Sequence, residues 1–236
     1  SMDQVIVNVR NAFTLHADET ARQAMLRFFK EPIDCYGMKS AVVEQISKEN
    51  FKTIKGYSKK EIFDICEIFW KSPKIEENMV ACSWSYNIKK SFDPNDFDLF
   101  KYWINTYVNN WATCDTFCNR NMGDLILKYP DLLSHLKEFT QSDNRWMKRA
   151  AAVSLIVPAR KGLFLNDMFE TALILLEDPD DMVQKGYGWM LKVASQTHQK
   201  EVFEFIMKHK QRMPRTALRY AIEKMPEDLK KQAMSK

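Results

Sequence analysis

A tryptophan and an aspartate stand four residues apart, at Trp111 and Asp115, a spacing that places both side chains on one face of a helix. A fixed carboxylate can stabilise positive charge or orient a water molecule, and an indole can offer its π face to a cation. The pair could therefore act on a positively charged group. A tryptophan on a helix nevertheless belongs to the core more often than to a ligand site, and that alternative stays open.

Two later segments carry further candidates. The first contains Arg149, and the second is Lys185-Gly186-Tyr187-Gly188-Trp189. An Asp–Arg pair across helices is usually a structural ion pair, so Arg149 alone indicates little. Each glycine inside a helical pattern costs about 1 kcal/mol relative to alanine. A close approach of a neighbouring backbone is the usual compensation.

The elements that must position these side chains are predicted to be helices. The chain has only 6 glycines and 8 prolines in 236 residues. Apolar residues recur at helical spacing in segments such as Glu61–Trp70 and Asp167–Leu176, and alternating apolar and polar runs are scarce. We therefore expect an all-α protein.

Capping patterns indicate where helices begin. Ser58 and Glu61 form a capping-box pattern. An N-cap or an N-terminal turn with proline near the first helical position is expected at Asp93-Pro94, Asp178-Pro179 and Met225-Pro226. A helix break is expected at Val157-Pro158.

Similar helix starts recur along the chain, at intervals of 31, 35, 37 and 31 residues, beginning at Val80, Trp111, Trp146, Val183 and Pro214. This spacing is typical of two-helix repeats of the HEAT kind, although ordinary bundles can space helices similarly. We expect an α-solenoid of HEAT-like repeats that forms one domain over residues 1–236. Stacked helix pairs of this kind form a curved slab, and basic residues would line its concave groove.

Charge is distributed unevenly. Residues 1–139 hold 18 Lys and Arg against 19 Asp and Glu, whereas residues 140–236 hold 17 against 12. The basic C-terminal part weakly indicates a polyanionic partner. No apolar run approaches the roughly 18 residues of a membrane span, which argues against an integral membrane protein.

The cysteines and histidines indicate neither a disulfide framework nor a metal site. Five scattered cysteines without a CxxC pair are typical of reduced, buried thiols in the cytoplasm, where we expect the protein to reside. Cys114 and Cys118 share a helical face, but two thiolates make a poor metal site, and the four histidines lie far apart. Ser1-Met2 is typical of a cloning remnant, and no signal-peptide pattern follows it.

Three segments taken together carry a resemblance: residues 111–118 (WATCDTFC), 142–149 (SDNRWMKR) and 182–192 (MVQKGYGWMLK). In order and separation they resemble the signature blocks of the DNA alkylation repair family, the AlkD-like HEAT-repeat DNA glycosylases. Residues 213–220 also resemble a terminal block found in part of that family. The resemblance covers essentially the whole chain.

The resemblance implies a monofunctional DNA glycosylase of base excision repair, a hydrolase that removes cationic N3- and N7-alkylated purines from double-stranded DNA. The residues that match the family pattern are Trp111, Asp115, Arg149 and Trp189. An alkylated purine is a good leaving group, so catalysis must chiefly stabilise the oxocarbenium-like sugar, a role that suits Asp115. Arg149 would keep Asp115 ionised and could hold a phosphate, and the tryptophans would contact the cationic nucleotide. Such a monomeric enzyme requires no metal or organic cofactor.

The remaining basic residues are candidate phosphate contacts, which would position DNA without reading its sequence: Lys148, Arg160, Lys161, Lys185, Lys192, Arg212, Arg215 and Arg219. For each of them a solvated surface charge is an equally good interpretation. Ser40 is a further candidate, because Cys35–Ser40 resembles a family loop that approaches the DNA backbone. Lys148 is not expected to act as a lyase nucleophile, because it points about 100° away from Arg149 on the same helix.

The chain also departs from the family pattern. Ala112 stands where the family often has an acidic residue, and Val157 where a polar or basic residue is common. The main alternative is therefore a non-enzymatic HEAT-like protein that binds branched or damaged DNA. A protein-interaction scaffold is a third possibility and should have a mixed or acidic groove. Retention of the four site residues favours the enzyme.

Overall fold

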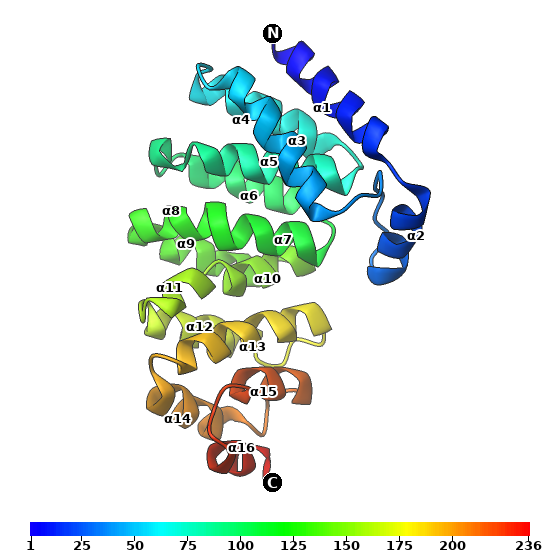
Figure 1. The fold of residues 1–236 in the computed structure, drawn as a ribbon. Helices are drawn as coiled ribbons and strands as arrows, with labels where there is room; N and C mark the ends of the chain where they lie inside the picture. Colours follow the sequence, from blue (N-terminus) through cyan, green and yellow to red (C-terminus); the bar gives the residue numbers. More distant parts are fainter. The chain divides into compact units, whose positions relative to one another are not determined.

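The computed structural model describes residues 1–236, and the chain is all-helical. Its one extended pairing is an isolated bridge between Asp34 and Lys74. No helix combines the length and the apolar character that a membrane crossing requires. The prediction of an all-α protein is confirmed, and the succession of helix pairs is that of an α-solenoid (Figure 1).

The chain divides into two compact units. The first comprises Ser1–Asp93 and Lys101–Phe117, and the second comprises Pro94–Phe100 and Cys118–Lys236. The division passes through helix α6 (Asp96–Tyr107) and falls again directly after helix α7 (Trp111–Phe117). The single domain expected over residues 1–236 stays a prediction.

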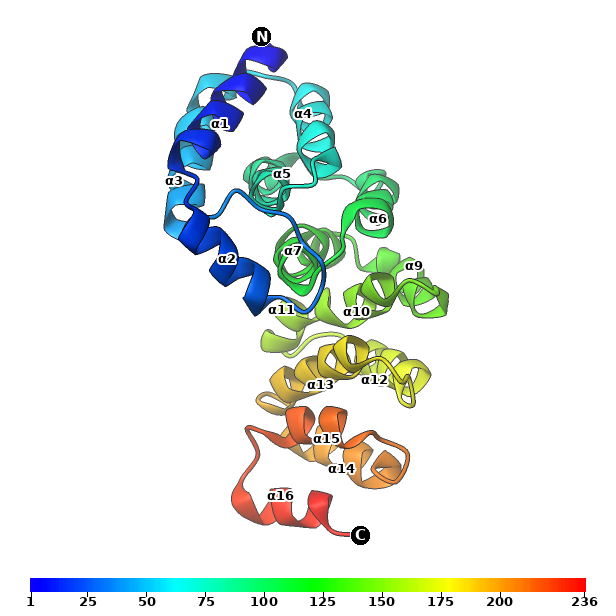
Figure 2. The same cartoon turned by 90° about the vertical axis from the view of Figure 1, so that its right-hand side faces the viewer.

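The first unit is built around buried aromatic rings, among them Trp70, Trp84 and Trp103. The helices are α1 (Met2–His16), α2 (Glu19–Phe28), α3 (Ser40–Phe51), α4 (Lys59–Lys71), α5 (Ile75–Asn87), α6 (Asp96–Tyr107, shared between the units) and α7 (Trp111–Phe117). Helix α5 packs against α3, α4 and α7, and α1 packs against α3 (Figure 2).

The second unit is organised around α13, which packs against α10, α11, α12, α14 and α15 (Figure 2). Its longer segment begins with a π-helical turn at Cys118–Met122. The helices are α8 (Gly123–Lys128), α9 (Leu133–Lys137), α10 (Arg145–Val153), α11 (Ile156–Arg160), α12 (Leu165–Leu175), α13 (Asp181–Ser195), α14 (Gln199–His209), α15 (Arg215–Ile222) and α16 (Glu227–Met234).

One helix of each repeat begins at a nearly constant interval. The starts of α3, α5, α7, α10, α13 and α15 are 34 to 36 residues apart. The observed repeat is more regular than the predicted one, because Val80 lies in the middle of α5 and the helix begins at Ile75. Within the units, α3 packs on α5, α5 on α7, α10 on α13, and α13 on α15. The repeat prediction is thus confirmed, with its first boundary corrected.

The predicted start of helix α4 is confirmed. Ser58 and Glu61 form a capping box at the start of α4. Near Asp178-Pro179, however, α13 begins at Asp181, because the Asp180 side chain accepts hydrogen bonds from the backbone N–H groups of Met182 and Val183. The proline therefore precedes the helix instead of occupying its first turn.

The predicted break at Val157-Pro158 also lies elsewhere. Helix α10 ends at Val153, and Pro158 belongs to α11. Pro158 is the third residue of α11, and a proline in the first turn of a helix has no intrahelical hydrogen bond to lose. None of the five cysteines forms a disulfide, and all of them are buried.

Candidate functional site

Helix α7 carries Trp111 and Asp115 on its less buried side. The opposite side, formed by Thr113, Cys114 and Phe117, is buried. The side chain of Asn110 accepts a hydrogen bond from the backbone N–H of Thr113 at 3.0 Å and thus caps the start of the helix. The spacing of four residues therefore places Trp111 and Asp115 on one face of the helix, as predicted. Both side chains are half-buried and face away from the core.

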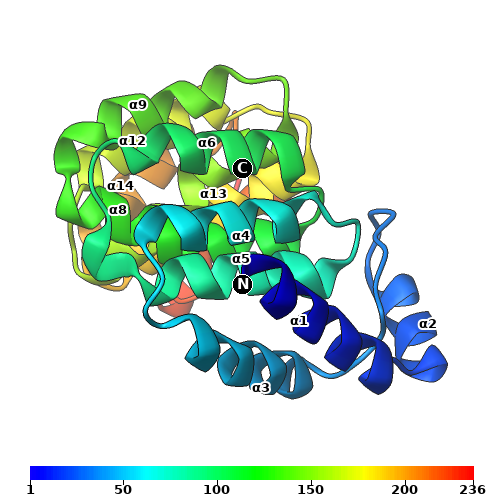
Figure 3. The ribbon, with the colours of Figure 1, turned by 90° about the horizontal axis from the view of Figure 1, so that it is seen from above.

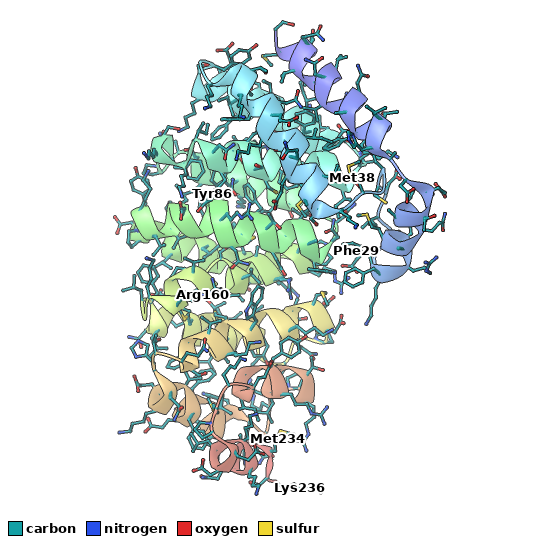
Figure 4. All side chains as sticks on the ribbon, in the orientation of Figure 1. Phe29, Met38, Tyr86, Arg160, Met234 and Lys236 are labelled. Carbon is teal, nitrogen blue, oxygen red and sulfur yellow. The ribbon has the colours of Figure 1, made fainter.

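Aromatic contacts hold the Trp111 indole in place. The Phe29 ring stacks on it, with centroids 5.5 Å apart and planes at 25°, and Phe28 meets it edge-on at 6.1 Å. The Trp111 backbone N–H donates to a Glu31 carboxylate oxygen at 3.3 Å. Phe29 lies beyond the end of α2 and points toward the start of α7 (Figure 4). One face of the indole is therefore covered by protein.

Phe28 differs from Phe29 in being open to solvent. Its exposed fraction is 70%, which is unusual for a phenylalanine and places a free aromatic surface beside Trp111. Helix α2 buries none of its own residues. Both phenylalanines were missed by the sequence analysis, because nothing in their spacing links them to a tryptophan about 80 residues later.

Arg149 is almost fully enclosed in the second unit. It is 6% exposed, and its Nη1 donates to the backbone carbonyl of Met182 at 2.7 Å. Helix α10 begins at an Asn144 cap whose side chain accepts from the Trp146 N–H. The guanidinium is thus tied to the first turn of α13, which carries Trp189.

The two glycines of α13 make room for its neighbours. A Cβ at Gly186 would lie 3.2 Å from Cγ of Arg149, and a Cβ at Gly188 would lie 2.7 Å from Cβ of Tyr220 and 2.9 Å from the carbonyl oxygen of Ala217. The interpretation of these glycines as sites of close approach is confirmed. Trp189 follows them and is half-buried. Tyr187 between them is buried; burial raises the pKa of its phenol, which donates to the carbonyl of Leu176.

Four of the eight candidate phosphate contacts are engaged in ion pairs. Lys148 pairs with Asp178 at 2.8 Å and Lys192 with Glu223 at 3.1 Å, and these are joined by the pairs Lys185–Asp181 and Arg212–Glu177. The hydrogen bond from Lys192 holds the pKa of Glu223 below its usual value. Any contact of these cations with a phosphate would have to compete with a carboxylate.

The other four candidates form no ion pair. Arg160, Lys161, Arg215 and Arg219 are exposed, and Arg215 contacts the sulfur of Met234. Ser40 is also exposed and is the first residue of α3. The first unit holds 15 Lys and Arg against 14 Asp and Glu, and the second holds 20 against 17. The two units therefore differ less in net charge than residues 1–139 and 140–236 do.

The predicted site residues are divided between the units. Trp111, Asp115 and Ser40 belong to the first unit, whereas Arg149, Trp189 and all eight candidate phosphate contacts belong to the second. Within each unit most of them lie on the helices that begin every 34 to 36 residues, such as α7, α10, α13 and α15. Within each unit, the same helix of the repeat thus carries most of the candidate residues.

A family model described as DNA alkylation repair enzyme matches residues 9–225. The chain belongs to this family. A solved structure described as a predicted DNA alkylation repair enzyme from Enterococcus faecalis shares the fold, with a TM-score of 0.81 over 90% of this chain and 98% of that one, at 16% identity. No protein of curated function matches the sequence.

Membership of this family agrees with the resemblance seen in the sequence and implies an enzyme that acts on DNA. No group of three or more His, Cys, Asp or Glu side chains is placed to hold a metal ion. The carboxylates that pair with Lys148 and Lys185 were the other feature missed by the sequence analysis. The acidic run at residues 178–181 was a usable signal, since it directly precedes α13.

Proposed function

We propose that the protein is a monofunctional DNA glycosylase that excises cationic N3- and N7-alkylated purines from double-stranded DNA. The observation that carries this proposal is the pairing of Trp111 and Asp115 on the less buried side of α7, in a chain of the DNA alkylation repair family. A carboxylate fixed on a capped helix keeps its position while charge develops on the sugar.

In this proposal the chemistry is loss of the damaged base followed by attack of water at C1′. The alkylated purine leaves with the electron pair of the N-glycosidic bond and becomes neutral. Asp115 stabilises the resulting oxocarbenium-like sugar and orients the water, whose proton is released as the new C1′–O bond forms. The uncovered part of the Trp111 indole contacts the cationic nucleotide, while Phe29 supports the indole from the other face.

The second unit carries the other residues that match the family pattern. Arg149 is fixed by Met182 and packed against Gly186, so its charge is preorganised to keep a carboxylate ionised or to hold a backbone phosphate. Trp189 supplies a second aromatic surface. Arg160, Lys161, Arg215 and Arg219 would bind phosphates directly, and Lys148, Lys185, Lys192 and Arg212 would exchange a carboxylate for a phosphate.

The decisive experiment measures release of 3-methyladenine and 7-methylguanine from methylated duplex DNA. Asp115→Asn should reduce release at least a hundredfold, because it removes the charge that faces the developing cation. The variant should remain folded, since the change is isosteric. Asp131→Asn is a matched control, because it removes an exposed carboxylate elsewhere in the chain and should leave release unchanged.

Three results would contradict the proposal in different ways. Equal release by the wild type and Asp115→Asn would refute the role of Asp115. No release by the wild type, with salt-sensitive DNA binding retained, would favour the non-enzymatic DNA-binding alternative. No DNA binding at all would favour a protein-interaction scaffold.

A further inference from the structure

The first unit contains a cavity of about 460 Å³ that involves neither Trp111 nor Asp115. It lies between α1, the loop that precedes α3 and the turn that joins α4 to α5, elements that Figure 3 shows from above. Three cations and three neutral or acidic polar groups line it, namely Arg10, Lys71, Lys74, Tyr36, Ser72 and Glu77.

Two buried glutamates at the start of α5 fix one wall of the cavity. Glu77 is 2% exposed, and its two carboxylate oxygens accept hydrogen bonds from Nε of Arg10 at 2.9 Å and from the Tyr36 hydroxyl at 2.6 Å. The Glu76 carboxylate accepts hydrogen bonds from the backbone N–H groups of Tyr36 and Gly37. Arg10 and Tyr36 are therefore held in place by contacts below the cavity surface.

The cations keep much of their hydrogen-bonding capacity free. Arg10 uses Nε on Glu77, which leaves its terminal nitrogens for another acceptor. The Lys74 ammonium lies 5.2 Å from the centre of the Tyr36 ring and pairs with Asp34 at 3.2 Å. Lys71 is exposed and forms no ion pair. The lining holds three cations against one carboxylate, and each oxygen of that Glu77 carboxylate already accepts a hydrogen bond. The lining therefore presents net positive charge and unused donors, which suits a phosphate group.

The segment that lines this cavity also reaches Trp111. Phe29 and Glu31 contact Trp111, and Tyr36 lies seven residues after Phe29. Seven extended residues span at most about 25 Å. A duplex that contacts Trp111 has many phosphates within that distance, because successive phosphates of one strand rise by about 3.4 Å.

We infer that the cavity between α1 and the α4–α5 turn is a phosphate-binding site. Two sources of phosphate fit its chemistry, the phosphodiester backbone of the duplex outside the lesion and a free phosphate ion. The backbone source rests on the proposed function, whereas phosphate binding by the cavity does not.

The test compares Lys71→Glu with Lys55→Glu, which makes the same charge change at an exposed lysine of the first unit outside the cavity. Thermal unfolding is measured in inorganic phosphate and in chloride at equal ionic strength. Phosphate should raise the midpoint of the wild type and of Lys55→Glu, and the rise should be lost in Lys71→Glu. Lys71→Gln, which only removes the charge, should show an intermediate loss.

A second measurement identifies the source of the phosphate. Binding of an undamaged duplex should weaken roughly tenfold in Lys71→Glu at low salt. In Lys71→Gln, the slope of the logarithm of the binding constant against the logarithm of the salt concentration should fall by about 1, the value for one lost phosphate contact. A phosphate-dependent midpoint with unchanged duplex binding would assign the site to free phosphate. Equal behaviour of the Lys71 and Lys55 variants in both measurements would overturn the inference. Neither measurement involves turnover, so its outcome is independent of whether Asp115→Asn affects base release.

Discussion

The two helices that carry the proposed tryptophans are held in opposite ways. Helix α7 presents Trp111 to Phe28 and Phe29 at the end of α2, a helix that buries none of its own residues. Helix α13 presents Trp189 from the centre of the second unit, where glycines bring α10 and α15 against its backbone. The first tryptophan is positioned by side chains and the second by backbone contact.

This difference predicts different responses to substitution. Side-chain contacts at the surface can readjust, so changes around Trp111 should affect function more than stability. Close contacts with a neighbouring backbone cannot readjust without moving helices, so a change at Gly188 of α13 should affect stability first. The following substitutions test this contrast.

Gly188→Ala should have the largest effect on stability. The new Cβ would lie 2.7 Å from Tyr220 Cβ and 2.9 Å from the carbonyl oxygen of Ala217, so α15 must shift. We expect a loss of about 2 kcal/mol in the free energy of unfolding, despite the higher helix propensity of alanine. Chemical denaturation measures the loss. Gly56→Ala is the control, because nothing lies within 4 Å of its Cβ position. Equal stability of the two variants would show that α13 and α15 adapt easily.

Phe29→Ala should reduce base release roughly tenfold, because the Trp111 indole loses the ring that supports one of its faces. The free energy of unfolding should fall by only about 1 kcal/mol. Measuring release and unfolding on the same sample separates the two effects. Phe28→Ala is informative beside it, since a residue 70% exposed should contribute little to stability. A larger loss of stability in Phe29→Ala than in Gly188→Ala would contradict the contrast between the two helices.

Gly186→Ala should alter function with little change in stability. Its Cβ would meet Cγ of Arg149 at 3.2 Å, and a side chain can move by the few tenths of an ångström required. The helix propensity of alanine offsets the remaining strain. We expect a several-fold drop in base release, measured at saturating DNA, because the guanidinium is displaced. Unchanged release would show that the position of Arg149 is not critical.

Asp178→Asn should produce the smallest effect. It removes the charge that pairs with Lys148 but keeps an oxygen that can accept from the backbone N–H of Asp180. Undamaged duplex should bind about two- to threefold more tightly at low salt, and the difference should vanish at high salt. Fluorescence anisotropy is sufficient to measure it. Weaker binding would show that Lys148 takes no part in phosphate contact.

Local sequence patterns were enough to predict the parts of the fold that depend on neighbouring residues. The capping box of Ser58 and Glu61, the shared face of Trp111 and Asp115, and a recurrence of helices at intervals of 31 to 37 residues all follow from short-range patterns. The structure narrows that interval to 34 to 36 residues. The errors were also local. Asp180, and not Asp178, caps the start of α13. The segment at Val80 resembles a helix start, although α5 begins five residues earlier.

The long-range contacts could not be predicted in the same way. Phe29 and Trp111 are separated by about 80 residues, and the pairing of Lys148 with Asp178 depends on the packing of α10 beside α13. The role of Gly186 and Gly188 could be predicted in part. Their cost inside a helix indicated a close approach, but only the structure identified Arg149 and Tyr220 as the residues that approach.

The sequence by itself determined that the chain is helical and repetitive, and which residue types carry the proposed chemistry, because periodicity, capping and residue identity are local properties. The tertiary structure decided which side chains hold Trp111, which cations are occupied by carboxylates, and where buried glutamates organise a cationic cavity. These features depend on segments that fold against each other from distant parts of the chain, so no short stretch of sequence specifies them.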